Sequence, residues 1–436
     1  MRNDRPAKFA VFAENFRGMP NGWHNILACN FLVGENSTGK TSFMQLIEII
    51  DSRQHQLLFE ICGIVEGINT AFDVCSRHDV KNEVTVGFLT KEVGEEKAHG
   101  KDGVFGRLVT YKVIRGELAV KKVTIVSGRR IITLKREPKG VYFKLGSFFY
   151  DDGEAHAENG DRLLRAHIRK GRRFKIAKEV KWPDIASNVV WFAVFTSIAT
   201  SSDEERGTAF MDLNPPLHCL QYAPLRAKTR RLYHSSKGDF SPTGEHVPYI
   251  LRGVGGENSD LRDVVVKFGK ESGLFDDIKV VSVKTSLKDK PFALQIKKGG
   301  GYFYVDELGF GVGQVLPIIA DIAFSAKTYT LLIQQPELHL HPKAQASLGE
   351  VFLKATEEGG TFIVETHSDF IVDRFRLRLK QSKAVVAAQI IYFENDEKNG
   401  NLCHEILLDK EGELVGVPDG YRQFFLNESL DQFENM

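Results

Sequence analysis

The feature that most constrains the fold is a glycine-rich loop at residues 34–41. The run Gly34-Glu-Asn-Ser-Thr-Gly39-Lys40-Thr41 is a full match to the P-loop pattern GxxxxGK[ST]. Apolar residues at 26–33 predict a strand that enters this loop, and apolar residues at helical spacing from Phe43 to Ile50 predict an amphipathic helix after it. A P-loop needs a strand before it and a helix after it, so the sequence predicts an α/β fold around a phosphate-binding loop.

The chemistry of such a loop is set by its backbone. Its glycines let successive N–H groups point at an anion, and the dipole of the following helix adds favourable charge. Lys40 is expected to reach the β- and γ-phosphates of a nucleotide, and the Thr41 hydroxyl to contact Mg²⁺. The candidate cofactor-binding residues of the loop are Asn36, Ser37, Thr38, Gly39, Lys40, Thr41 and Ser42.

A second glycine loop, Gly309-Phe-Gly311-Val-Gly313-Gln314, precedes an apolar segment that contains Pro317. Since proline is best tolerated in the first turn of a helix, we expect that helix to begin near Gly313. Its N-terminus, with no bulky side chains, would be a second anion-binding end. Glycines before a helix are common, but together with a P-loop they suggest that two elements hold one triphosphate.

Two further apolar runs, residues 330–333 and 361–365, are typical of buried parallel strands. The first leads into Gln334-Gln335-Pro336-Glu337, and the second into Thr366-His367. Open α/β sheets place ligand-binding groups at the carboxyl ends of their parallel strands. A lone histidine is usually structural, but this position makes His367 a candidate sensor of the γ-phosphate.

Between these motifs the pattern changes. Residues 84–145 alternate with period two and are punctuated by Gly116, Gly128 and Gly140, which predicts an antiparallel meander. Residues 156–181 are expected to be helical, with nine Lys or Arg between Arg162 and Lys181. This basic segment is either a nucleic-acid-binding patch or a solvated helix face, and the lack of interleaved aromatic residues favours the solvated face.

Composition excludes several classes of protein. The chain has 58 Lys and Arg against 57 Asp and Glu, so it has no overall polyanion-binding character. Its start lacks the apolar region of a secretory signal, and its longest apolar stretch, residues 189–199, is too short to span a bilayer. The five scattered cysteines lack metal-binding spacing. A cytoplasmic protein without membrane contact is expected.

The set of motifs resembles the ATP-binding-cassette-type (ABC-type) AAA ATPases related to the OLD and RecF proteins. The matching elements are Asn15-Phe16-Arg17, the P-loop, Tyr222-Ala-Pro224-Leu-Arg226, Gly309–Gln314, Pro336–Pro342 and Glu365–Ser368. They lie toward both ends of the chain and omit roughly residues 91–190. We call Gly309–Gln314 the signature loop and Glu365–Ser368 the H-loop.

The resemblance implies an ABC-ATPase-like P-loop head, a mixed sheet flanked by helices, with an inserted β meander and basic helical segment. The expected domains are an N-terminal lobe at 1–90, the insertion at 91–190 and a C-terminal lobe at 191–436. It further implies ATP and Mg²⁺ as cofactors. Two heads would pack head-to-tail, and the signature loop of one would cap the γ-phosphate bound by the other. Arg17, Gly311, Gly313 and Gln314 join the candidate cofactor-binding residues on this basis, and Arg226 is either a phosphate or inter-lobe contact or a partner in a structural ion pair.

The chain departs from the family pattern at three positions. Gly313 stands where the signature usually carries serine, and Gln334 and Gln335 stand where acids are usual. An amide can offer oxygen to a metal but cannot accept the proton of attacking water. Binding should therefore survive better than turnover. The candidate catalytic residues are Gln334, Gln335, Glu337 and His367, and the candidate metal ligands are Thr41 and Gln334; Glu337 and Glu365 are nearby acids that could substitute.

The role expected from the resemblance is that of an ATP-gated switch. Stand-alone ATPases of this type resemble the ATPase subunits of bacterial anti-phage systems such as Septu and PARIS. By this resemblance we expect a homodimer or higher oligomer that controls an effector. The residues after Asp369 are too few for a Toprim nuclease domain, so we expect the effector nuclease to be a separate chain. The alternatives are a RecF-like DNA-repair clamp, with DNA as the partner, and a non-catalytic scaffold or sensor that binds ATP.

Overall fold

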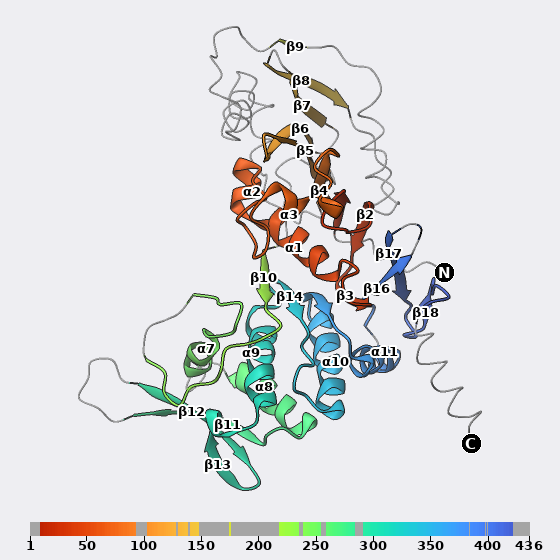
Figure 1. Ribbon diagram of the computed structural model, residues 1–436. Coiled ribbons are helices and arrows are strands. Elements are labelled where there is room, and N and C mark those ends of the chain that lie inside the picture. The colour runs from red at the N-terminus through yellow and green to blue at the C-terminus, as the bar shows by residue number, and fades with distance from the viewer. Residues whose placement is uncertain are drawn as a thin grey trace.

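The protein is described here by a computed structural model, which covers residues 9–92, 103–127, 130–137, 140–147, 174–175, 218–234, 239–253, 259–283, 291–382, 384–396, 398 and 400–421. The described chain is elongated. A mixed sheet lies near its middle, an antiparallel sheet extends away on one side, and a group of helices lies on the other (Figure 1).

The central sheet has seven strands in the order β10-β14-β15-β3-β16-β17-β18. Strands β10, β14, β15, β3 and β16 are parallel to their neighbours, and the β16–β17 and β17–β18 pairs are antiparallel. The strand bounds are β10 (Cys219–Tyr222), β14 (Thr330–Gln334), β15 (Thr361–Glu365), β3 (Cys29–Gly34), β16 (Ala388–Asp396), β17 (Gly400–Leu408) and β18 (Leu414–Val415). The strands expected at 330–333 and 361–365 are confirmed, and the strand expected at 26–33 is present as β3, beginning at Cys29, because Ile26 belongs to β2 (Gly22–Ile26).

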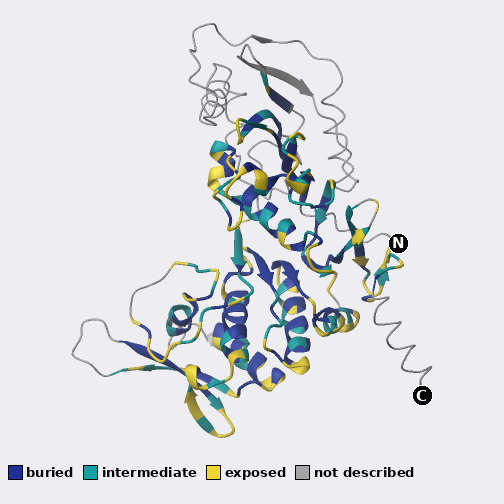
Figure 2. Cartoon of the chain, viewed as in Figure 1, coloured by how far each residue is buried: buried dark blue, intermediate teal, exposed yellow. Residues whose placement is uncertain are grey.

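Both faces of this sheet are buried, because alternate residues of each strand enter different cores. Leu331 and Ile333 of β14 join a core formed with α8, α9, α10 and α11, whereas Leu332 between them joins a core formed with α1 and the antiparallel sheet. Burial on both faces explains why these strands are apolar throughout rather than alternating. The helices are α1 (Lys40–Asp51), α8 (Ser259–Ser272), α9 (Phe310–Ser325), α10 (Pro342–Glu357) and α11 (Asp369–Gln381). Figure 2 shows the resulting concentration of buried residues in the sheet and in the adjoining helices.

The second sheet has eight antiparallel strands in the order β2-β1-β4-β5-β6-β7-β8-β9. Their bounds are β1 (Phe9–Glu14), β2 (Gly22–Ile26), β4 (Val84–Glu92), β5 (Gly103–Ile114), β6 (Glu117–Ser127), β7 (Arg130–Glu137), β8 (Gly140–Ser147) and β9 (Phe174–Lys175). The expected meander is confirmed. It continues the sheet of β1 and β2, and the expected domain boundary at 90/91 falls within β4.

The remaining elements are small. Strands β11 (Asp277–Ser282), β12 (Phe292–Lys298) and β13 (Gly301–Tyr304) form a three-stranded antiparallel sheet beside α8. The short helices are α2 (Arg53–Leu58), α3 (Ala71–Val74) and α7 (Val247–Gly253), with 3-10 turns η1 (Ser76–His78) and η3 (Val305–Glu307).

The helix expected at 156–181 is wrong for the two residues of that range that the structure describes. Phe174–Lys175, inside the expected basic helix, form strand β9 through pairing with Tyr142 and Phe143 of β8. Two-residue pairing to an existing sheet edge overrides local helix preference here, because tertiary context outweighs propensity. The other residues of 156–181 lie outside the described residues.

The helix after the signature loop starts earlier than expected. It begins at Phe310, not near Gly313, and Pro317 lies inside it. An internal proline removes one helix hydrogen bond and costs about 3 kcal/mol. Residues on both sides of Pro317 are fully buried, and its ring packs at Gly244, where a Cβ would lie 2.6 Å from the ring. Burial of a strongly apolar helix offsets the proline penalty.

The arrangement confirms the fold expected from the sequence. A parallel core carries the P-loop, and an antiparallel sheet and a helical layer flank it. Among the described residues, no helix has both the length and the hydrophobicity that a membrane span requires.

Candidate functional site

The P-loop lies where strand β3 turns into helix α1. Gly34 and Gly39 adopt φ values of 133° and 109°, which favour glycine, and a Cβ on Gly34 would lie 1.9 Å from the Phe393 carbonyl oxygen. Gly39 is also the N-cap of α1, so the first backbone N–H groups of the helix are not covered by a capping side chain. The loop and the helix dipole together form an anion-binding end.

Lys40 holds its ammonium group within this loop. Its Nζ donates hydrogen bonds to the carbonyl oxygens of Gly34, at 3.0 Å, and Glu35, and the residue is only 4% exposed. Burial lowers the pKa of Lys40, and the negative charges of Glu365 and Glu35 oppose that shift. The structure therefore places one positive charge at the carboxyl end of β3, inside the loop that the sequence predicts to bind phosphate.

The hydroxyl of Thr41 faces an acid on the neighbouring strand. Thr41 Oγ1 lies 3.3 Å from both carboxylate oxygens of Glu365, the last residue of β15. Glu365 is paired in register with Gln334 at the end of β14, and both side chains are buried. Burial raises the pKa of Glu365, while Lys40 and the Thr41 hydroxyl act in the opposite direction.

These groups fit a hard divalent cation. Mg²⁺ prefers oxygen ligands and usually binds proteins through one or two side chains together with substrate phosphates. Thr41 and Glu365 supply a hydroxyl and a carboxylate in mutual contact, and Gln334 adds an amide at the next strand end. Within the described residues, no group of three or more His, Cys, Asp or Glu side chains forms a metal cage. A bound Mg²⁺ would supply positive charge that neutralises the nucleotide phosphates.

Glu337 is used to hold the H-loop. Its carboxylate accepts hydrogen bonds from the Thr366 hydroxyl at 2.8 Å and from the His367 backbone N–H at 2.7 Å. The His367 side chain is exposed, and partial desolvation together with the charge of Lys40 lowers the pKa of its ring. The ring therefore lies close enough to the P-loop lysine to be affected by its charge, and the role of His367 as a γ-phosphate sensor stays a prediction.

Gln335 sits in a strained turn one residue after β14. Its φ is 43°, a left-handed conformation that is uncommon for a residue other than glycine, and its N–H donates to the Glu365 carbonyl oxygen at 2.8 Å. Gln335 is partly exposed, whereas Gln334 is buried. Of the two glutamines, Gln335 is thus the one whose side chain has access to water.

Arg226 ties the end of β14 to the signature loop. Its guanidinium donates to the carbonyl oxygens of Gln334 at 2.7 Å, Gln335 at 3.2 Å and Pro224 at 3.0 Å. Its backbone N–H and carbonyl are held by the side-chain amide of Gln314, at 3.1 and 3.2 Å. Burial lowers the pKa of Arg226 to about 10, so the group stays cationic. Among the described residues, the Arg226 side chain bonds to backbone carbonyl oxygens and forms no ion pair.

The other predicted residues divide into two groups. Gly311 and Gly313 lie in the first turn of α9, and Gln314 is buried with its amide engaged by Arg226. Asn36 and Ser37 are exposed on the P-loop, and the Thr38 hydroxyl donates to the Glu35 carbonyl.

Arg17 lies beside the P-loop helix, but its side chain supports a loop. Its guanidinium donates to the carbonyl oxygens of Gly67, at 3.0 Å, and Asp73, at 2.8 Å. Its own carbonyl oxygen accepts a hydrogen bond from Ser42 at 3.3 Å. The hydrogen bond between Ser42 and the Arg17 backbone therefore holds the first turn of α1 against the segment that contains Arg17.

Part of the chain matches a known protein family. Residues 253–373 match the family described as "AAA domain, putative AbiEii toxin, Type IV TA system". The matched range contains the signature loop, Gln334, Gln335 and His367, but not the P-loop, and it is less than half of the chain. A comparison with curated protein sequences found no match.

Solved structures of SMC heads are similar over most of their length. They include an SmcHead bound to the C-terminal winged-helix domain of ScpA (12% identity, TM-score 0.44, covering 93% of this chain and 99% of that chain). Another is the SMC head domain from Thermotoga maritima (11% identity, TM-score 0.35, covering 95% and 100%). A third is an Smc head with an extended coiled coil, bound to the C-terminal domain of ScpA and derived from Pyrococcus furiosus (10% identity, TM-score 0.39, covering 99% and 99%). Scores and identities of this size carry no information about partners or substrates.

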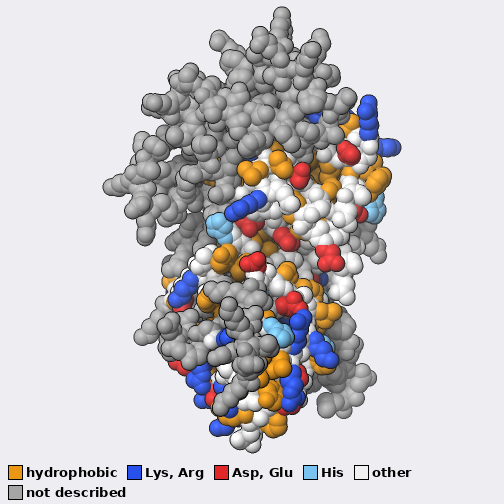
Figure 3. Space-filling view, turned by 90° about the vertical axis from the view of Figure 1, so that its left-hand side faces the viewer, with side chains coloured by type: hydrophobic (Ala, Val, Ile, Leu, Met, Phe, Trp, Pro, Cys, Tyr) orange, Lys and Arg blue, Asp and Glu red, His pale blue; other side chains and the backbone are white. Residues whose placement is uncertain are grey.

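The basic segment cannot be placed at the site, because residues 162–173 and 176–181 lie outside the described residues. On the face shown in Figure 3, the described Lys and Arg side chains are interspersed with Asp and Glu side chains.

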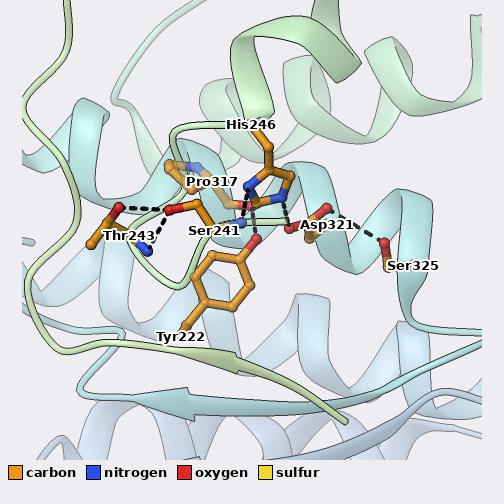
Figure 4. A network of polar contacts seen from close by, with 7 residues as sticks. All are labelled: Tyr222, Ser241, Thr243, His246, Pro317, Asp321 and Ser325. Atoms are coloured by element: carbon orange, nitrogen blue, oxygen red, sulfur yellow. Dashed lines mark hydrogen bonds and ion pairs between the residues drawn. The ribbon is translucent and has the colours of Figure 1, made fainter. Parts of the chain in front are cut away.

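A network of polar contacts that the sequence did not reveal anchors α9, the helix that begins at the signature loop (Figure 4). His246 Nε2 donates to Asp321 of α9 at 2.8 Å, and the Ser241 backbone N–H donates to His246 Nδ1 at 3.1 Å. The Ser241 hydroxyl contacts Thr243 at 2.9 Å, not the imidazole, so this serine and histidine do not form a nucleophile–base pair. The network instead fixes residues 241–246 against the helix that begins at the signature loop.

Replacing Asp321 with asparagine should change how stability depends on pH. Burial raises the pKa of Asp321 to about 7, well above its ordinary value of 3.8. In the wild-type protein, the stability that protonated Asp321 contributes is therefore fully present below about pH 4 and is lost as pH rises through about 7. Asparagine keeps an acceptor for His246 and does not titrate. We expect the unfolding free energy of Asp321→Asn, relative to wild type, to increase by a few kcal/mol between pH 4 and pH 7.

Urea unfolding at several pH values measures this difference. A difference that stays constant from pH 4 to pH 8 would show that Asp321 is already ionised in the folded protein at the lower end of that range.

Proposed function

We propose that this protein is an ATP-binding switch that hydrolyses ATP slowly and uses the bound nucleotide to control its assembly. One observation carries the proposal. Two adjacent parallel strands, β3 and β15, and the loops that follow them bring the P-loop lysine, the Thr41–Glu365 pair and the H-loop to a single edge of the central sheet, where β14 also ends in Gln334. Ligands of open α/β sheets bind at this edge.

Slow turnover follows from the groups at that edge. Gln335 is the accessible residue at the end of β14, and its amide cannot accept a proton from water. Glu337 has a carboxylate, but both of its oxygens already hold the H-loop. The described residues at this edge can therefore bind a triphosphate and Mg²⁺ better than they can activate water.

Assembly is proposed to join two copies head-to-tail, with the signature loop of one copy at the P-loop of the other. Support comes from the exposed apolar side chains beside the signature loop. Phe310, at the start of α9, is 65% exposed, and its ring lies near that of His339, with 5.8 Å between ring centroids. Leu225, next to Arg226, is 67% exposed. Both would lose water contact if a second copy covered this loop.

The biological setting is proposed to be control of a separate effector in bacterial anti-phage defence. The motif set resembles ATPase subunits of such systems, and the matched family is described as a putative toxin of a type IV toxin–antitoxin system. The anti-phage ATPase subunits and the toxins of toxin–antitoxin systems both act together with a second protein or RNA partner. The nucleotide-bound assembly would be the state that the effector recognises or is held by.

Sedimentation velocity with and without ATP and Mg²⁺ tests the proposal, together with single-turnover phosphate release. We expect a larger species with ATP and a phosphate release rate well below one per second. A chain that binds ATP without any change in assembly would contradict the switch, and rapid release would contradict slow hydrolysis.

Phe310→Ala should weaken ATP-dependent assembly while sparing nucleotide binding. Burial of a phenylalanine contributes about 1.5–3 kcal/mol, which corresponds to a loss in self-association of roughly 10- to 150-fold for each copy of Phe310 that is buried. Phe324→Ala is the matched control, since Phe324 lies near the other end of the same helix and is 57% exposed. The two variants should be compared by the concentration dependence of sedimentation in ATP. Equal effects of both variants would argue against the signature loop as the interface.

A further inference from the structure

The acid that contacts the Thr41 hydroxyl is Glu365 of β15, whereas the sequence motifs place the expected acid at position 334, in β14. Thr41 Oγ1 contacts both carboxylate oxygens of Glu365, at 3.3 Å each. Position 334, where an acid is expected, carries an amide and is the in-register partner of Glu365. A negative charge is thus present at this edge, displaced from the end of β14 to the end of β15.

We propose that Glu365 is the acidic residue through which this protein binds the Mg²⁺ of its nucleotide, in place of the acid missing at Gln334. The inference rests on the proposed function, because it assigns the metal-binding group of the same site. The ligand of this site would be a hard divalent cation that is also bound by the nucleotide phosphates.

Burial and charge favour this assignment. Glu365 is 6% exposed, so its charge is poorly screened by water, and Lys40 is the cation that acts on it. A carboxylate in this position attracts Mg²⁺ more strongly than the uncharged amide of Gln334 can. The contact with Thr41 places that charge beside the hydroxyl expected to bind the same ion.

The other acid at this edge is already occupied. Each carboxylate oxygen of Glu337 accepts a hydrogen bond, one from Thr366 and one from the His367 backbone. Moving Glu337 toward the metal would strain two short hydrogen bonds to the H-loop, whereas the hydrogen bonds described for the Glu365 carboxylate are the long contacts with the Thr41 hydroxyl. Glu337 therefore provides a matched control for a nearby acid with a different role.

The position of the two acids on adjacent strands also predicts an exchange. Because Gln334 and Glu365 are register partners at the same strand ends, swapping their identities keeps one acid and one amide at the edge. The double substitution Gln334→Glu/Glu365→Gln should therefore keep a metal-binding carboxylate, at the position where it is usual in the family that the sequence resembles.

The test measures how much Mg²⁺ strengthens nucleotide binding. A fluorescent ATP analogue, mant-ATP, is titrated into each protein once with Mg²⁺ and once with EDTA, and the ratio of the two affinities is compared. Glu365→Gln should reduce this ratio at least 10-fold, with little loss of affinity in EDTA. Glu337→Gln disturbs the H-loop and should lower the affinity in Mg²⁺ and in EDTA alike, so the ratio should fall far less than in Glu365→Gln. The exchanged double variant should recover most of the wild-type ratio.

Electron paramagnetic resonance of Mn²⁺ gives a second readout that does not depend on turnover. With mant-ATP present, wild type should bind one Mn²⁺ per nucleotide, and Glu365→Gln should bind it at least 10-fold more weakly. A wild-type Mg²⁺ ratio in folded Glu365→Gln would overturn the inference while leaving nucleotide binding intact. Absence of nucleotide binding by wild type in both conditions would overturn it together with the proposed function.

Discussion

Lys40→Ala should lower the affinity for ATP by at least 100-fold. The ammonium of Lys40 is the positive charge inside the P-loop, and its hydrogen bonds to phosphate would be charge-assisted, contributing about 1.5–3 kcal/mol each. Two such bonds correspond to a loss of roughly 10²- to 10⁴-fold. Isothermal titration with ATP and Mg²⁺ measures the change directly.

The substitution also removes two internal hydrogen bonds, so its fold must be checked. In the wild-type protein Nζ is bonded to the carbonyl oxygens of Gly34 and Glu35. Circular dichroism and thermal unfolding without nucleotide establish whether Lys40→Ala is folded. Lys343→Ala, at the exposed start of α10, is a control for loss of one positive charge away from the loop. Unchanged ATP affinity in a folded Lys40→Ala protein would refute the P-loop as the nucleotide site.

The P-loop and its flanking elements were predictable because their determinants are local. Gly34 and Gly39 need backbone conformations that other residues rarely adopt, and Lys40 follows at a fixed spacing. The apolar spacing from Phe43 to Ile50 specifies a helix without reference to the rest of the chain. The buried parallel strands were likewise marked by short apolar runs between turn residues.

The contacts that complete the site were not predictable from local pattern. Glu365 meets Thr41 only because β15 is inserted between β3 and β14, an order that depends on pairing between distant segments. His246 and Asp321 are 75 residues apart and belong to a loop and a helix with no shared motif. Strand order and side-chain networks of this kind are set by tertiary packing, which a single sequence does not display.

Where a local rule failed, burial explains the failure. The rule that proline belongs in the first turn placed the start of α9 near Gly313, yet the helix starts at Phe310. Its apolar residues are buried on nearly every side, and Gly244 leaves room for the Pro317 ring. The resulting three-residue shift puts Gly311 and Gly313 inside the first turn of the helix instead of in front of it.

Gln335→Glu should raise the rate of ATP hydrolysis by about 10²- to 10⁴-fold, the usual contribution of a general base. Gln335 is the accessible residue immediately after β14, and its backbone is fixed by the bond to the Glu365 carbonyl and by Arg226. A carboxylate there could accept the proton that the amide cannot. Steady-state phosphate release at saturating ATP and Mg²⁺ measures the gain.

The control for this gain is the same charge placed one residue earlier. Gln334→Glu puts a carboxylate in a buried position beside Glu365, where two like charges disfavour each other's ionised forms. It should therefore raise turnover much less than Gln335→Glu, and its effect should depend more strongly on Mg²⁺. Equal gains from both variants would mean that metal binding limits the rate, and no gain from Gln335→Glu would mean that a step other than water activation does.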